Sequence, residues 1–364
     1  MKKLSAKQKL RQRRLQKKHE ERSLRSKRIH KHMRKYGANS RPPRSGEIGF
    51  RKKFITLHIP ASLSFEDNQE ETLQFFQRFK ELASQHPSQR FKIDFTTMEK
   101  VGVAAALVLA AELDRWRKKN NLRLRVVDFD DWNPNIRSLF NEMGLFSLLQ
   151  IEKLPVYDEP DKSVEFVKFT TGRGAEGQAA KELRLAIQDT FDIEVPESSK
   201  LYSALIEAMT NAKHHAYPDD YEYKHPPLKL QWWMVGSFDK VKNNLTIVFF
   251  DQGIGIPRTI PRKNTREAIE FCLAKLGLKN NDASLIRAAM ELNRSGTEQS
   301  NRGYGLYRNI RNYADSMPEG NFRVLSGKGE YRYSPHNDAF KNGEYLLTLN
   351  SDIGGTLIQW DANL

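Results

Sequence analysis

The sequence predicts an α/β domain followed by an α+β domain, with a disordered arm in front of them. Residues 54–151 alternate short apolar strands with helical segments, which is the order expected of an α/β layer. Residues 179–360 begin with two helices and continue mainly with strands, which indicates an α+β domain with helices packed on an antiparallel-looking sheet. Residues 1–44 are dominated by Lys, Arg, Gln and His, and their few leucines are too sparse to form a core face.

The positive charge of the chain is concentrated in this basic arm. The 364 residues have a formal net charge of +15, whereas residues 1–44 contain 18 Lys and Arg against two glutamates. The arm is therefore +16 and the remaining 320 residues sum to −1. Such an arm favours nucleic acid as a partner, because each phosphate that it neutralises releases counterions. A solubilising tail and a site for an acidic protein remain alternatives.

Cysteine content and hydropathy restrict the class of protein further. Cys272 is the only cysteine, which excludes an internal disulfide and a cysteine-cluster metal site. The longest run free of charged and strongly polar residues, 101–111, is too short to cross a bilayer, and the N-terminus lacks the apolar core of a secretory signal. We therefore expect a cytoplasmic protein with no membrane partner. The oligomeric state stays open.

Before residue 155, hydrophobic periodicity predicts three strands and three helices. The expected strands are 54–59, 91–95 and 122–127, the expected helices are 66–86, 103–117 and 133–143, and an apolar segment follows at 146–151.

This part of the chain resembles STAS domains, the small modules of anti-sigma-factor antagonists and sulfate transporters. The resemblance covers roughly residues 52–153 and is carried by KIDFTTMEKVGVAAALVLAAEL and IRSLFNEMGLFSLLQI. In the antagonists, a phosphorylatable serine lies between the second strand and the helix, but residues 99–104 (EKVGVA) offer no hydroxyl there. Thr96 and Thr97 lie too close to the strand to take that role. The resemblance therefore implies a regulatory module that contacts a protein partner, and not a phosphoacceptor.

The expected domain boundaries follow from these patterns. They are an arm and linker at 1–50, a STAS-like domain at 51–155, a linker at 156–178 and a second domain at 179–364. In the second domain we expect helices at 179–189, 198–215 and 306–315, strands at 228–235, 245–251, 321–326, 345–350 and 356–360, and a mixed region at 257–301.

Glu207 and Asn211 lie four residues apart on an expected helix, so their side chains leave the same face. An amide oxygen of Asn211, together with phosphate oxygens, is a suitable ligand set for Mg²⁺. Glu207 could then act as a general base toward a group that attacks the γ-phosphate. Taken alone, this pair is more commonly an ordinary polar stripe on a helix.

Asp251 ends an apolar strand and begins the turn DQGIGIP, where its carboxylate could accept a hydrogen bond from the exocyclic amine of adenine. Gly253 and Gly255 would let the backbone approach the ring or the ribose. Thr356, after two glycines at the start of the last strand, could place a hydroxyl near Asp251. Each of these segments alone is also consistent with a tight turn.

A third glycine-containing segment consists of Gly303, Tyr304, Gly305 and Leu306, which open an expected helix. Backbone N–H groups at such a position can bind phosphate. The preceding polar stretch, 293–302, is suited to a lid.

In their order along the chain (207–211, 251–257, 303–306 and 354–356), the four segments resemble GHKL-type ATPases. This is the superfamily of gyrase B, the ninety-kilodalton heat-shock chaperone, histidine kinases and MutL. The resemblance covers about residues 180–361, and EAMTNAKHHAYP most resembles the N box of anti-sigma-factor serine kinases. It implies a Bergerat fold, Mg²⁺ on Asn211, the adenine amine on Asp251, the phosphates of ATP on the backbone of residues 303–306, and a water or hydroxyl near Thr356. His215 follows the N box and is expected to be structural.

The reaction itself stays open at this level. No helix with a phosphorylatable histidine precedes the domain and few residues follow Trp360, so we expect neither a sensor kinase nor a gyrase-type transducer. Glu207 could orient water for ATP hydrolysis, or it could deprotonate a serine of a partner in an anti-sigma type of kinase. The primary hypothesis is an ATP-binding regulatory protein that joins a GHKL ATPase to a STAS-like module. The alternatives are a serine/threonine kinase and a nucleotide sensor with negligible turnover that binds nucleic acid.

Overall fold

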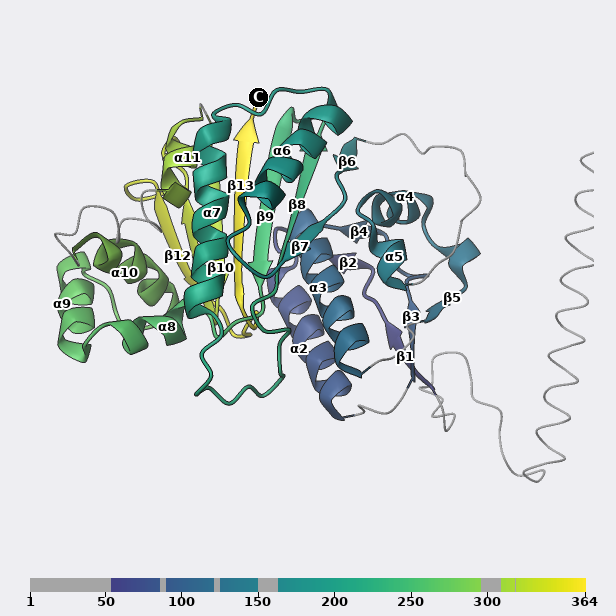
Figure 1. Ribbon diagram of the computed structural model, residues 1–364, viewed down its shortest axis with the longest axis horizontal. Helices are drawn as coiled ribbons and strands as arrows, with labels where there is room; N and C mark the ends of the chain where they lie inside the picture. The colour runs from purple at the N-terminus through teal and green to yellow at the C-terminus, as the bar shows by residue number, and fades with distance from the viewer. Residues whose placement is uncertain (1–53, 86–89, 121–124, 150–162, 296–308, 318) are drawn as a thin grey trace, which may run out of the picture. The chain divides into compact units, whose positions relative to one another are not determined.

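A computed structural model describes residues 54–85, 90–120, 125–149, 163–295, 309–317 and 319–364 (Figure 1). The expected arm lies outside these residues. The described residues form a mixed α/β structure, and residues 56–364 make up one compact unit that includes most of both expected domains. In the described part of the chain, no helix combines the length and the apolar character needed to cross a bilayer.

The larger sheet of this unit has eight strands. They are β6 (Val164–Phe166), β7 (Thr170–Gly172), β8 (Trp232–Asp239), β9 (Asn244–Asp251), β10 (Asn321–Ser326), β11 (Gly329–Tyr333), β12 (Glu344–Thr348) and β13 (Thr356–Asn363). Their order is β12-β11-β10-β13-β9-β8-β6, and β7 also pairs with β8. Each of these pairs is antiparallel, which confirms the antiparallel sheet expected from the sequence.

The strand predictions for this sheet need correction. Strands β6 and β7 were not predicted and lie within the expected linker 156–178. The strand expected at 228–235 begins at Trp232, because Leu230 has a positive φ of 63° and the Gln231 amide closes a turn onto the Leu228 carbonyl. Strand β11 was not predicted, since its sequence GEYRY lacks the continuous apolar character of its neighbours. Its two charged side chains, Glu330 and Arg332, form an ion pair at 2.7 Å.

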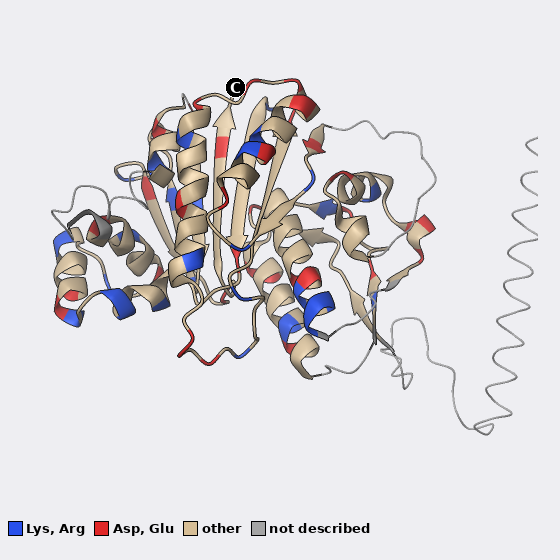
Figure 2. Ribbon diagram, in the orientation of Figure 1, with Lys and Arg blue, Asp and Glu red and all other residues tan. Residues whose placement is uncertain are grey.

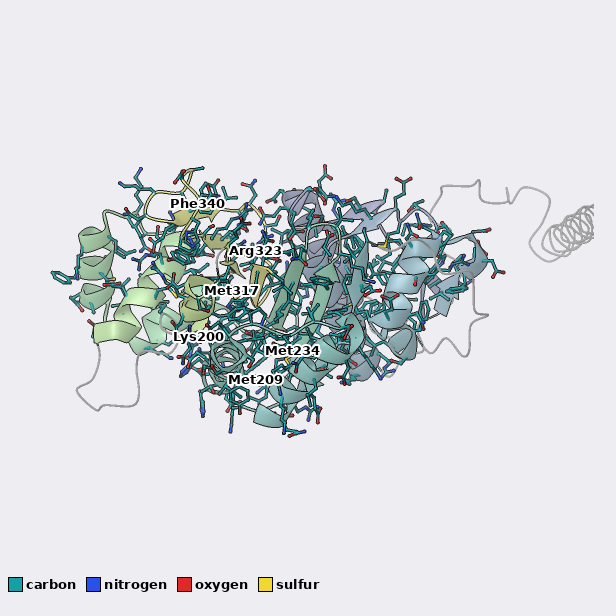
Figure 3. The ribbon with its side chains drawn as sticks, turned by 90° about the horizontal axis from the view of Figure 1, so that it is seen from above. Lys200, Met209, Met234, Met317, Arg323 and Phe340 are labelled. Atoms are coloured by element: carbon teal, nitrogen blue, oxygen red, sulfur yellow. The ribbon has the colours of Figure 1, made fainter. Side chains whose placement is uncertain are left out.

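Helices cover one face of this sheet. They include α6 (Gly177–Phe191), α7 (Ser198–His215), α10 (Asp282–Ser295) and α11 (Arg311–Asp315), while α8 (Ile256–Lys263) and α9 (Arg266–Leu276) lie beside α10. Alternate residues of β9, Leu245, Ile247 and Phe249, belong to the apolar core beneath these helices. Met209 of α7 and Met234 of β8 lie in the same core (Figure 3).

The opposite face of the sheet is buried as well. On β9, Val248 and Phe250 are fully buried, and the central strands carry few charged residues (Figure 2). This face is covered by α2 (Gln69–Gln85) and α3 (Val103–Asn120), on the side of the sheet away from α6 and α7 (Figures 1 and 3). A strand that is apolar on both sides is typical of a sheet covered on both faces.

Helices α2 and α3 belong to the N-terminal module, which we define as residues 56–149. Its other elements are β1 (Phe54–His58), β2 (Ser62–Leu63), β3 (Arg90–Asp94), β4 (Lys100–Val101), β5 (Arg125–Val127), the short 3-10 helix η1 (Phe129–Asp131), α4 (Pro134–Glu142) and α5 (Leu145–Leu149). The three-stranded sheet has the order β1-β3-β5, with β3 and β5 parallel. Residues 104–111 of α3 are all fully buried, because α3 contacts β8 and β9 of the large sheet as well as α2 and α5 of its own module.

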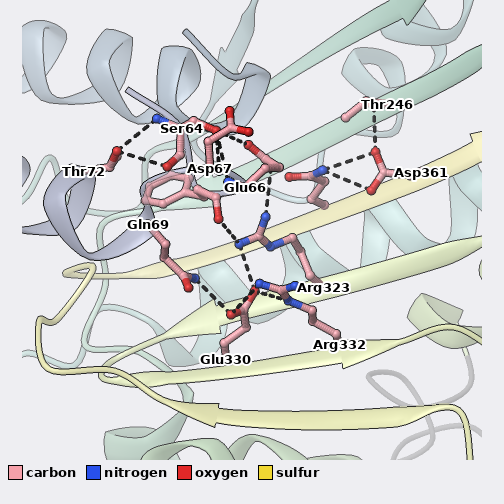
Figure 4. Close-up of polar contacts among 12 residues, drawn as sticks. Ser64, Glu66, Asp67, Gln69, Thr72, Thr246, Arg323, Glu330, Arg332 and Asp361 are labelled. Carbon is pink, nitrogen blue, oxygen red and sulfur yellow. Dashed lines mark hydrogen bonds and ion pairs between the residues drawn. The ribbon is translucent and has the colours of Figure 1, made fainter. Parts of the chain in front are cut away.

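A buried polar network joins the N-terminal module to the large sheet (Figure 4). Arg323 of β10 bonds Glu330 at 2.8 Å, Glu66 at 2.9 Å and the Phe65 carbonyl at 3.1 Å. Glu330 is completely buried and also accepts from Gln69 at 3.0 Å. Burial by itself would raise the pKa of Glu330, but neighbouring arginines, Arg323 first, hold it below its usual value.

We expect Arg323→Met to lower the free energy of unfolding by about 3 kcal/mol, because the completely buried Glu330 and the Phe65 carbonyl lose this partner. Urea denaturation measures this loss. The double variant Arg323→Met/Glu330→Leu should recover much of it, since neither charge then remains buried. A single variant within about 0.5 kcal/mol of the wild type would contradict this role for the network.

Candidate functional site

A hollow lies on the face of the large sheet that α7 and α10 cover, where β9 ends and β13 begins. We call it the strand-end hollow. It is lined by Asn211, Asp251, Gly255 and Thr356, all of which the sequence singled out. These residues come from α7, the turn after β9 and the start of β13. The hollow contains about 600 Å³ of atom-free space, part of it open to solvent.

Helix α7 brings Asn211 to the wall of the hollow. The Asn211 side-chain nitrogen donates to Glu207 Oε1 at 2.7 Å, which leaves the amide oxygen as the atom available to a ligand. Glu207 is half-buried and is not among the described residues that line the hollow. The structure therefore places Glu207 where it orients the Asn211 amide.

Asp251 presents a buried carboxyl group at the end of β9. Its residue is 4% exposed, and one carboxyl oxygen accepts the Gly253 N–H at 2.8 Å. Burial raises the pKa of Asp251 to about 7, although the N–H groups of Gly253 and Thr356 limit the rise. This carboxyl group therefore changes its charge near neutral pH.

Two glycines are required where these segments meet. A Cβ on Gly253 would overlap with Ala216, whose carbonyl accepts the Ile254 N–H at 2.8 Å. Gly355 has a φ of 149°, and a Cβ there would overlap with the Asp251 carbonyl. Gly253 does not line the strand-end hollow; it lies against α7 and a second cavity described below.

Thr356 forms a hydroxyl pair with a residue that the sequence analysis did not identify. Its Oγ1 lies 3.0 Å from Ser326 Oγ, and its Cα is opposite Asp251 in the register of β13 and β9. Ser326 also accepts the Ile256 N–H at 2.8 Å, which ties the start of α8 to the end of β10. Its place at the end of an expected strand was the only available sequence signal.

Lys263 of α8 is a further residue of the hollow that sequence reasoning missed. Burial lowers the pKa of Lys263 to about 8, with Glu207 acting in the opposite direction. Burial, followed by the charge of Lys263, lowers the pKa of His215 to about 4. At neutral pH the wall therefore carries a lysine cation and a neutral histidine. Lys263 follows Thr259 and Ile260 at helical spacing, and all three line the hollow, so this periodicity could have revealed it.

The remaining predicted segment, Gly303, Tyr304, Gly305 and Leu306, lies outside the described residues. So does most of the expected lid at 293–302. The helix expected at 306–315 is represented within them by α11.

The strand-end hollow thus combines a buried acceptor, an oriented amide oxygen and a cation. Among the described residues, no group of three or more His, Cys, Asp or Glu side chains is placed to hold a metal ion. A metal held here would need oxygen ligands from a bound molecule as well as Asn211. No protein-family model matches the sequence, and the search of curated proteins finds no match either.

Proposed function

We propose that the chain is an ATP-binding regulatory protein whose strand-end hollow binds ATP with Mg²⁺, as the resemblance of residues 180–361 to GHKL ATPases implies. The observation that carries this proposal is that Asn211, Asp251, Gly255 and Thr356 line one hollow although three separate segments supply them. In the same proposal, residues 179–364 form a Bergerat-type domain and residues 51–155 a STAS-like module.

The adenine ring would bind at the Asp251 end of the hollow. A buried carboxylate is a strong acceptor for an exocyclic amine, since little water competes for it. Gly255 and Phe249 form part of the adjoining wall, and the lack of a side chain at Gly255 would let a planar ring approach the backbone.

The phosphates would extend toward α7 and α8. Lys263 supplies a positive charge there, and the Asn211 amide oxygen is oriented by Glu207. Asn211 would hold Mg²⁺ through this oxygen, and the metal would supply positive charge that screens the phosphates. One protein oxygen is sufficient in such a site, because Mg²⁺ keeps several of its waters.

We expect Asn211→Ala to weaken ATP binding in the presence of Mg²⁺ by at least about tenfold, because the metal loses its protein ligand. Calorimetry on the full chain measures the affinity, and urea denaturation checks that the variant is folded. Asn141→Ala, on the exposed surface of α4, is the matched control and should bind like the wild type. No detectable binding of adenine nucleotides to the wild type would overturn the proposal.

The affinity for ATP should rise as the pH increases through about 7, because the adenine amine needs the ionised form of Asp251. One pH unit below this pKa, the affinity should be about tenfold lower. The same titration of Asp251→Asn is the control, since the phosphates of the nucleotide titrate in this range as well. Equal pH slopes in the two proteins would contradict the role of Asp251.

The position of Glu207 favours nucleotide sensing as a second candidate function. Its carboxylate is engaged by Asn211 and does not line the hollow, whereas a general base must reach the attacking group. Hydrolysis by this protein would require Glu207 to reach the γ-phosphate when the nucleotide is bound.

Glu207→Gln separates these activities, because the glutamine oxygen can still accept from Asn211 while its amide cannot take up a proton. If Glu207 is the base, ATP binding should persist and turnover should fall by about a hundredfold or more. ATP labelled at the γ-phosphate gives the readout: free phosphate indicates hydrolysis, and label on a co-purifying protein indicates a serine/threonine kinase. Binding without either product indicates a sensor. Equal turnover in the wild type and the variant would rule out Glu207 as the base.

The N-terminal module would exert its regulatory role from the far side of the sheet. Its helices α2 and α3 cover the face opposite the strand-end hollow, so this module does not occupy the hollow. A protein partner would bind the remaining surface of the module. Residues 1–44, with their charge of +16, would contact nucleic acid.

A further inference from the structure

A second cavity lies on the other side of the turn that follows β9; we call it the cationic hollow. It contains about 940 Å³ of atom-free space, part of it open to solvent. Gln252, Gly253 and Ile254 form one wall, and α2, α3 and the segment around Tyr223 form others. Thus neighbouring residues of one turn line different cavities, since Asp251 and Gly255 belong to the strand-end hollow.

The described lining of the cationic hollow is strongly positive. It contains five cations, Lys80, Arg115, Lys224, Arg258 and Lys328, and a single carboxylate, Asp352. Asp352 is paired with Arg258 at 2.6 Å, and Lys224 is paired with Glu81, which lies outside the lining, at 3.0 Å. Among the described residues, no carboxylate forms an ion pair with Lys328.

Two of these cations are buried and share one carboxylate. Lys80 and Arg115 are each about 5% exposed, and both contact Glu112, which is completely buried. The Arg115 Nε is buried without a hydrogen-bond partner. Two cations thus share one carboxylate at the floor of the hollow, and burial lowers the pKa of Lys80. An incoming anion would stabilise the charged form of Lys80.

Other features of the wall agree with a positive site. Burial, and then the charges of Arg115, Lys224 and Lys80, lower the pKa of His225. Gly354 has a positive φ of 75°, and a Cβ there would overlap with the Lys80 ammonium group. His225 thus lies in a positive environment, and Gly354 leaves the space that the Lys80 side chain occupies.

We infer that the cationic hollow binds a small molecule carrying two or more phosphate groups. Arginine and lysine at its floor and rim supply the donors that phosphate oxygens need, and the enclosed space is too limited for a folded protein. Tyr221 and Tyr223, whose ring centroids are 4.9 Å apart, line the same hollow and would contact a planar group of the ligand. This site is separate from the nucleotide site proposed above and does not depend on it.

Inorganic pyrophosphate without added metal is the probe, titrated into the full chain by calorimetry at physiological salt. The double variant Lys224→Gln/Lys328→Gln should weaken binding by about tenfold or more, because both side chains are exposed at the rim and their loss leaves the fold intact. The control is Lys229→Gln/Lys242→Gln, which removes two exposed lysines outside the hollow. The control should change the affinity less than about twofold, since it alters only the general charge.

A third variant, Lys263→Gln, distinguishes this site from the strand-end hollow. Pyrophosphate affinity should stay within about twofold of the wild type, because Lys263 lines only the other cavity. A loss as large as that of Lys224→Gln/Lys328→Gln would place the anion in the strand-end hollow and overturn the inference. Equal losses in the two double variants would indicate non-specific binding to the basic chain and would overturn the inference as well. The absence of detectable pyrophosphate binding to the wild type would also overturn it.

Discussion

The burial of β9 on both of its faces is the constraint on which the rest of this structure depends. Helix α7 and its neighbours cover one face and α3 covers the other, so the polar residues at the end of the strand are removed from bulk water. Successive side chains of a strand point in opposite directions, and Asp251 and Gln252 accordingly line different cavities. Removal from water raises the pKa of Asp251, and in the neighbouring cavity it lowers that of Lys80.

The same constraint explains the spacing of the glycines. Three chain segments, the end of α7, the turn after β9 and the start of β13, approach closely at the strand end, and at two positions there is no room for a Cβ. Gly253 lies against Ala216 and Gly355 against the Asp251 carbonyl, so packing requires both glycines independently of any ligand. A nucleotide-binding role for this turn therefore adds to a structural role.

The attachment of the N-terminal module to the sheet is polar as well as apolar. Arg323 of β10 bonds Glu66 and the Phe65 carbonyl, and Gln69 donates to Glu330, which is buried and paired with Arg323. Lys80 donates to the Ile353 carbonyl at 2.5 Å. Buried ion pairs contribute less to stability than to defining one arrangement, because desolvation offsets much of their attraction. In this protein they would define how α2 and α3 lie on the sheet, and with that the walls of the cationic hollow.

The sequence by itself determined those features that depend on local pattern. Hydrophobic periodicity located α7 and most strands. The spacing of Glu207 and Asn211 on one helix face identified Asn211, and residue types at strand ends identified Asp251 and Thr356. Only the tertiary structure decided which of these meet, and it added Lys263 and Ser326 to the same hollow. It also showed that residues 329–333 form strand β11, although the sequence GEYRY lacks the apolar pattern expected of a strand. The cationic hollow likewise appears only in the structure, because its lysines and arginines are far apart in the chain. Which distant residues line the same cavity depends on how the elements pack together, and a local sequence pattern carries no information about that packing.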